Sequence, residues 1–459
     1  MIWTADHKIV ELRRKLSSIE EELNYWCAQT SKNGPLPKHH SQVLRVSRRL
    51  RVLTRKLAEW IATLEHDANK LVQEGRDVEL MILDIHRIWD FFRSKLAQRY
   101  VGHFQDYLVV ADEFAWSCYS PAIAAAESAR TTRAPAKEPP LVFLNGGWSP
   151  YTVSRGEAFE AEWVGDDDIL SADFLEVLDD LPITVIGIPW FQIRHLPDAL
   201  VIGHEVGHAV EDDFDLSTTL EAALEACLRK RRVVGDRTRG WRAWRGELFA
   251  DCYGILAGGP SFVSSLMDCL ALSSEGIVTA VQSDSHWEPH PPETLRILFN
   301  VHVLRALGFP AQARDLEEVW RDRFPSHAMM EFEDDIGPIA DTLLGVKYPQ
   351  FGKASLPEVI SFGDTQIAEA DATQLSLKQG LTPTGSIRGV LAGARCAFES
   401  DPAGFFNARA DEVVVARIRA ERSGETRGED AETPESADSS AGEELFEQLK
   451  SQRRRRRQP

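Results

Sequence analysis

The first 65 residues carry apolar side chains at helical spacing. In two stretches, separated by a Gly- and Pro-containing loop at residues 31–37, apolar residues recur three or four positions apart: Ile9, Leu12, Leu16, Ile19, Leu23 and Trp26, then Val46, Leu50, Leu53, Leu57, Trp60 and Leu64. This spacing puts the apolar side chains on one face of each helix. The pattern predicts an antiparallel helical hairpin or a dimerising coiled coil, so residues 1–75 are a candidate surface for a helical partner or for self-association.

Further along, helical and strand-like segments alternate. A third, aromatic-rich helical stretch is expected over residues 78–125, followed by a Pro-rich loop at 126–140. Two short apolar runs, 141–144 and 183–188, predict β-strands because they combine β-forming residues with flanking turn formers. Helical periodicity returns from about 310 to 420.

These segments predict an α+β protein that is mostly helical and has one small sheet. Its expected parts are a helical appendage at 1–125, a core at 126–310, a helical C-terminal part at 311–420 and a charged tail at 421–459. The tail is rich in Glu, Ser, Gly and Arg, so we expect it to be disordered. It ends in five arginines, Arg453 to Arg457, which could bind an acidic partner or fold back on an acidic part of the chain.

Charge is unevenly distributed along the chain. The net charge is −19, and residues 81–420 alone carry −20. Such an acidic body disfavours nucleic acid and anionic membranes as partners. The predicted second helix is basic instead, with Arg45, Arg48, Arg49, Arg51, Arg55 and Lys56 mostly off its apolar face. We interpret these residues as a solvated face, with contact to a partner or to nucleic acid as the alternative.

The sequence gives no sign of export or of a membrane span. Its first residues contain no apolar signal-like core, and no stretch reaches 18 apolar residues without a break. Six cysteines are scattered without a C-x-x-C pair, which indicates neither a disulfide framework nor a cysteine zinc site. We therefore expect a cytoplasmic protein.

Candidate chemistry is concentrated in the pentapeptide H-E-x-x-H formed by His204, Glu205 and His208. On a helix, positions four apart lie on one face, so both imidazoles can reach one metal ion with Glu205 beside it as a base. Chance alone would produce this pentapeptide in about 3 of 100 chains of similar composition. Its apolar, helix-compatible surroundings make a metal site a better explanation than chance, because buried imidazoles and carboxylates are energetically costly unless they bind a metal.

A third ligand is offered by a second helical segment, in which Glu247 and Asp251 are again four apart. A hydrolytic zinc site uses three protein ligands and keeps one position open, and a ligating imidazole is usually oriented by a carboxylate on its other nitrogen. We predict that Glu247 is the third ligand and that Asp251 orients a histidine. Glu221 and Glu225 form a competing pair with the same spacing.

An H-E-x-x-H followed by a distant E-x-x-x-D resembles the gluzincin metallopeptidases, and thirty-eight residues separate His208 from Glu247 here. The wording E-L-F-A-D-C-Y-G is most similar to the HtpX-like and CAAX-prenyl protease branch. That branch also carries a later His-Pro followed by Arg, matched here by His290 and Arg296. The resemblance covers about residues 188–296.

The resemblance implies a zincin-like catalytic core, with His290 near the transition-state oxyanion and Arg296 supporting it. Read from the residues alone, His290 could instead cap a helix that begins at Pro291 and Pro292 and ends at Gly308. Members of that branch are embedded in membranes, which no segment here matches, so prenylated substrates are not inferred.

Together these features predict an intracellular metallopeptidase that binds one Zn²⁺ through His204, His208 and Glu247, with Glu205 as general base and a peptide or protein as substrate. A zinc-held scaffold without turnover is the alternative, and a helical interaction protein in which the motif is accidental is a further one. The presence of Glu205 favours the enzyme, because a purely structural zinc site needs no base.

Overall fold

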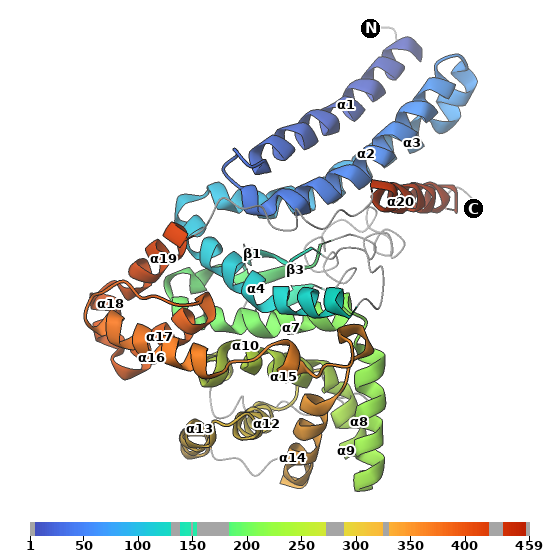
Figure 1. Ribbon diagram of the computed structural model, residues 1–459. Coiled ribbons are helices and arrows are strands. Elements are labelled where there is room, and N and C mark those ends of the chain that lie inside the picture. Colours follow the sequence, from blue (N-terminus) through green and yellow to red (C-terminus); the bar gives the residue numbers. More distant parts are fainter. Residues whose placement is uncertain are drawn as a thin grey trace.

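The computed structural model describes residues 5–129, 138–147, 150–153, 183–271, 289–324, 330–421 and 435–455. The described chain is mostly helical and contains one three-stranded sheet, which confirms the mostly helical α+β prediction (Figure 1). Two apolar cores lie on opposite faces of this sheet.

One core belongs to an N-terminal helical arm. Three helices form the arm: α1 (Ala5–Thr30), α2 (His40–Leu64) and α3 (Ala68–Ala97). The predicted apolar faces of α1 and α2 are buried against each other and against α3, with Leu12 and Leu53 fully covered. These faces therefore pack within the chain, as a hairpin with a third helix would. Helix α3 begins ten residues earlier than predicted, because the Asp67 side chain caps it by accepting from two backbone N–H groups.

The sheet has the order β1-β3-β2. Its strands are β1 (Leu141–Asn145), β2 (Tyr151–Val153) and β3 (Val185–Pro189). Strands β1 and β3 are parallel and correspond to the two predicted strands, while β2 runs antiparallel to β3 and was not predicted. A strand of three residues carries too short an alternation to be recognised in a sequence.

Side chains alternate between the two faces of the sheet. From β1, Val142 and Leu144 face the larger core, whereas Leu141 and Phe143 face the core of the arm. Helix α4 (Gly102–Ser128) packs in the larger core, where Phe114 is fully buried. The packing boundary therefore lies near residue 100, so α4 belongs with the core and not with the helical appendage at 1–125.

Two helices form the centre of the larger core, α7 (Ile202–Asp213) and α10 (Arg245–Leu270). They approach unusually closely, since a Cβ added at Gly207 would lie 2.8 Å from the Ala250 Cα atom and 2.9 Å from the Tyr253 Cβ atom. Only glycine fits at this position. The close approach brings the side chains of His204 and His208 on α7 to those of Glu247 and Asp251 on α10.

The remaining helices surround this pair, and those after residue 310 confirm the predicted helical C-terminal part. They are α8 (Ser217–Arg231), α9 (Asp236–Ala243), α12 (Glu293–Ala306), α13 (Pro310–Arg323), α14 (Met330–Gly345), α15 (Leu356–Val359), α16 (Asp364–Lys378), α17 (Ile387–Ser400), α18 (Pro402–Asn407) and α19 (Ala410–Glu421). Short 3₁₀ turns, Trp190–Arg194 and Leu196–Val201, connect β3 to α7.

The prediction of a disordered tail at 421–459 is wrong for its second half, which forms helix α20 (Glu435–Arg455) against α2 (Figure 1). Leu445, Phe446 and Leu449 join the core of the arm. These three apolar residues lie at helical spacing, and the polar composition around them concealed the pattern.

Helix α20 also covers the basic face of α2. The fully buried carboxylate of Asp438 lies 3.5 Å from Arg45, 3.8 Å from Arg48 and 3.5 Å from Arg49. Glu443 adds an exposed partner for Lys56 at 3.6 Å. The expectation of a solvated basic face is therefore wrong for these residues, because an acidic helix of the same chain occupies it.

Two further properties bear on the environment of the protein. Among the described residues, no helix is both long and apolar enough to cross a membrane. All six cysteines are free thiols, and Cys118 and Cys252 are buried.

The buried position of Asp438 generates a stability prediction. In Asp438→Asn, Arg45, which is 5% exposed, loses its partner at 3.5 Å and is left with Glu138 at 3.8 Å; removing one partner of a buried ion pair costs about 3 kcal/mol. We expect a lower melting temperature and faster proteolysis of α20. Glu447→Gln, an exposed change on the same helix, should alter neither, and an unchanged melting temperature in Asp438→Asn would show that the cluster is not stabilising.

Candidate metal centre

Three potential ligands meet where α7 and α10 begin. The Nε2 atoms of His204 and His208 lie 3.1 Å apart, and the two carboxylate oxygens of Glu247 lie 3.2 Å from His208 Nε2 and 3.4 Å from His204 Nε2. One ligand atom from each residue falls within 4.8 Å of the others. The predicted ligand set is thus brought together by the fold.

The atoms present fit a divalent cation. The Oε2 atom of Glu247 is buried and receives no hydrogen bond, although such an atom normally finds a donor. Two imidazole nitrogens facing one another at 3.1 Å also need a shared proton or a shared cation between them. Two imidazoles and one carboxylate are a donor set that suits zinc.

Asp251 contacts the ring nitrogen of His204 that faces away from the other potential ligands. Its Oδ1 atom lies 2.8 Å from His204 Nδ1, so it fixes the ring with Nε2 turned toward the other ligands. Asp251 is fully buried and accepts further hydrogen bonds from Arg296 and from Asn300. Burial alone would raise the pKa of Asp251, but the Arg296 guanidinium and these hydrogen bonds lower it to about 2.

Arg296, on α12, supports the carboxylates of the site. It donates to both oxygens of Asp251, at 2.7 and 2.8 Å, and its Nη2 atom lies 3.2 Å from Glu247 Oε2. The resemblance implied a role for Arg296 beside His290, whereas these contacts are to Asp251 and Glu247. The guanidinium compensates two buried negative charges.

Protonation of His204 competes with metal binding at this site. Burial alone would lower the pKa of His204, but the carboxylates of Asp251 and Glu247 raise it to about 9. Burial opposes ionisation of Glu247 as well, yet Arg296 and His204 hold the pKa of its carboxyl well below the usual range. Without a metal, His204 is therefore protonated at neutral pH. A metal ion bound at His204 would have to displace that proton, so its affinity would fall as the pH decreases.

His290 lies at the exposed rim of the site, with its Nε2 atom 3.4 Å from Glu247 Oε1 and its side chain 65% exposed. The predicted helix is present as α12 and is followed by Gly308 at a φ of 93°. Its N-cap is Pro292, without a side-chain cap hydrogen bond, so His290 is not the cap. Partial burial lowers the pKa of His290. A neutral imidazole at this rim can face a substrate.

Glu221 and Glu225, the alternative pair of carboxylates, form ion pairs away from the two histidines. Glu225 forms a two-oxygen ion pair with Arg242, and Glu221 lies 3.7 Å from Arg245. Neither belongs to the group of ligand atoms around His204. The alternative ligand assignment is therefore wrong.

Two residues that contact the site were not predicted from the sequence. Asn300 follows Arg296 by four positions on α12, a spacing that could have revealed it. Thr152, on β2, directs its hydroxyl to Glu205, at 2.6 Å from the carboxylate Oε2 and 2.8 Å from the backbone oxygen. Fifty-three positions separate these two residues, and nothing in the sequence links them.

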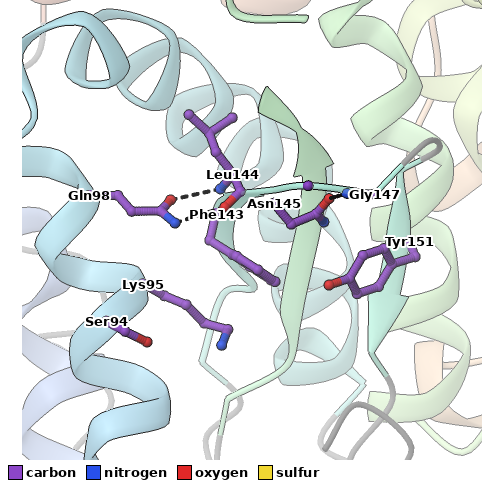
Figure 2. A pocket seen from close by; sticks show the side chains of 9 residues that line it. Ser94, Lys95, Gln98, Phe143, Leu144, Asn145, Gly147 and Tyr151 are labelled. Atoms are coloured by element: carbon purple, nitrogen blue, oxygen red, sulfur yellow. Dashed lines mark hydrogen bonds between the residues drawn. The ribbon is translucent and has the colours of Figure 1, made fainter. Parts of the chain in front are cut away.

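A hollow of about 470 Å³ lies between α3 and the sheet, lined by Lys95, Phe143 and Tyr151 among others (Figure 2). At its margin the Gln98 amide donates to the Leu144 carbonyl at 2.8 Å and accepts from the Leu144 N–H at 2.7 Å (Figure 2). This side chain occupies the outer edge of β1 as a neighbouring strand would. It leaves β2 as the other edge strand of the sheet.

The sequence matches no protein-family model, no curated protein and no solved structure.

The ligand assignment generates a prediction on metal binding. Glu247→Ala removes the only carboxylate of the proposed ligand set, so its affinity for Zn²⁺ should fall by at least 100-fold. Glu225→Ala removes a carboxylate that is paired with Arg242 and should bind Zn²⁺ normally. Competition against a chromophoric chelator measures both. Normal affinity in Glu247→Ala would refute the assignment.

Proposed function

We propose that this chain is a zinc-dependent metallopeptidase with a zincin-like core. The observation that carries the proposal is that three side chains able to hold a metal ion come together beside a further acidic residue, Glu205, whose carboxylate accepts a hydrogen bond from Thr152. A site that only stabilised the fold would need no such additional carboxylate, and it would more often be closed by a fourth ligand. The ligand group found among the described residues has three members.

Each side chain of the site can be given one role in peptide hydrolysis. His204, His208 and Glu247 would hold the zinc ion, which when bound supplies a Lewis acid for the peptide carbonyl and for the attacking water. Glu205 accepts a proton from that water and passes it to the departing amine. His290 donates a hydrogen bond to the oxygen that gains charge, while Asp251 and Arg296 keep the ligands in place.

The sheet supports binding of an extended peptide. Gln98 covers the outer edge of β1, and among the described strands none pairs with the outer edge of β2. Strand β2 is also the strand that contacts Glu205, through Thr152. We therefore place the substrate backbone along β2, where main-chain hydrogen bonds can align it without regard to its side chains.

The two alternatives differ from this proposal in what they explain. An accidental motif would not account for the convergence of Asp251, Arg296 and Asn300 behind His204, since buried polar groups are costly without a purpose. A zinc-held scaffold accounts for the ligands and leaves Glu205 unexplained. The free thiols fit a reducing compartment, and we propose that the enzyme acts in the cytoplasm.

The general base provides the decisive test. Glu205→Gln should still bind one zinc ion per chain and should lose peptide hydrolysis by about 10³-fold, because an amide cannot accept the proton. Substrates can be found by mass spectrometry of protein termini. Termini that appear in cells expressing the wild type, and not in cells expressing Glu205→Gln, mark the cleaved proteins. Glu221→Gln is the matched control. Full turnover in Glu205→Gln would remove this residue from the mechanism, and absence of turnover in the zinc-loaded wild type would favour the scaffold.

His290 generates a separate prediction. Because it does not cap α12, His290→Asn should leave the melting temperature and the zinc content unchanged. If it donates to the oxyanion, the shorter side chain should lower kcat by about 10²-fold, as seen when such donors are removed. His302→Asn, on α12 and paired with Asp341, is the control. Unchanged kcat in His290→Asn would leave the oxyanion without a protein donor that we can name.

A further inference from the structure

The contact between β2 and the proposed general base is unusually direct. The Thr152 hydroxyl lies 2.6 Å from Glu205 Oε2 and 2.8 Å from the Glu205 backbone oxygen, and its single proton can serve either acceptor. Glu205 is 6% exposed. Among the described residues, Thr152 is the only hydrogen-bond donor to this carboxylate, and the Oε1 atom accepts from none of them.

The register of the sheet places this hydroxyl. Thr152 pairs with Ile186 of β3, which faces the larger core around α7. Its neighbour Tyr151 points to the other face, where its ring meets Phe143 edge-on at 6.2 Å beside the arm. Side chains alternate along a strand, so a slip of one position would turn Thr152 away from Glu205. The hydrogen bond therefore depends on the exact pairing of β2 with β3.

We propose that Thr152 is a positioning residue, which holds one oxygen of Glu205 and so presents the other oxygen to the attacking water. This inference rests on the proposed peptidase function. Because β2 is also the strand on which we place the substrate, the same three residues would align the peptide and orient the base. Binding of a peptide along β2 would then depend on the same strand that orients the Glu205 carboxylate.

The physical reason is the freedom of a glutamate side chain. Three rotatable bonds separate its carboxylate from the backbone, and a general base must lie within hydrogen-bond reach of the proton that it accepts. Misplacement by about 1 Å can cost 10²-fold in rate. A hydrogen bond from a strand anchored in the sheet restricts this motion. Loss of the bond should therefore slow the chemical step while substrate binding stays nearly constant.

A purely structural role is the competing explanation, since the same hydroxyl also reaches the backbone oxygen of α7 at Glu205. Three substitutions separate the two. Thr152→Val keeps the shape and the β-branch that strands favour, Thr152→Ala removes the hydroxyl without adding a methyl group, and Thr152→Ser keeps the hydroxyl alone. A structural role would change the melting temperature and the zinc content, which a positioning role leaves alone.

The experiment compares these variants, the wild type and Glu205→Gln as full-length, zinc-loaded proteins on one peptide substrate found from the new termini. We expect kcat to fall by about 10- to 100-fold in Thr152→Val and Thr152→Ala, with KM within about 3-fold of the wild type. Thr152→Ser should recover kcat to within about 3-fold of the wild type. Zinc content and melting temperature should match in all variants.

The possible outcomes are distinguishable. Wild-type kcat in Thr152→Val and Thr152→Ala would overturn the inference and leave the peptidase intact. A loss that Ser does not restore, or that follows a fall in zinc content or melting temperature, would assign Thr152 a structural role and also overturn it. A wild type as inactive as Glu205→Gln on every peptide would overturn the proposed function itself, and the catalytic role of Thr152 with it.

A crystal structure of zinc-loaded Thr152→Val tests the geometric part without turnover. The inference expects the Glu205 carboxylate to leave its wild-type orientation or to occupy several. A carboxylate that keeps the wild-type orientation without the hydroxyl would overturn the inference.

Discussion

The site depends on how closely α7 and α10 can approach. Glycine at position 207 allows the backbone of α7 to contact Ala250 and Tyr253 of α10 without an intervening side chain. Gly203, one turn earlier, also lies close to α10, although an added Cβ there would be 3.3 Å from Ala257 and 3.5 Å from Gly254. This contact sets the distance between the two helices, and hence the distance between the imidazoles of α7 and the carboxylates of α10. A side chain at Gly207 would separate the groups that could hold a metal ion.

Charge compensation is the second requirement of this centre. Glu205, Glu247 and Asp251 are carboxylates in a largely dry part of the protein, and Arg296 is the cation that the described chain places among them. A divalent cation would balance the remaining negative charge. Such a cluster is costly to bury and gains stability only when every member is paired. Binding of the metal and stability of the core are therefore linked, since an ion that binds only the folded state stabilises it.

The sequence predicted those parts of the fold and site that rest on local spacing. His204 and His208, and Glu247 and Asp251, each lie four positions apart, so helix geometry alone brought each pair to one face. The apolar faces of α1 and α2 were predicted by the same periodicity. Contacts without a local signature could not be predicted: Thr152 reaches Glu205 through strand pairing, and Arg296 approaches Asp251 through packing of α12. The fold of α20 was missed because its charged composition outweighed three apolar residues.

The docking of α20 on α2 has a consequence for the order in which the chain can fold. Arg45 and Asp438 are separated by 393 positions, so this ion pair forms only after the long segment between them has been synthesised. Contacts of such long separation form late, whereas the local contacts of α1, α2 and α3 can form early. During synthesis the basic side chains of α2 that contact α20 thus remain without these partners until α20 has been made. Helix α20 thus completes an arm whose other three helices can pack before it is made.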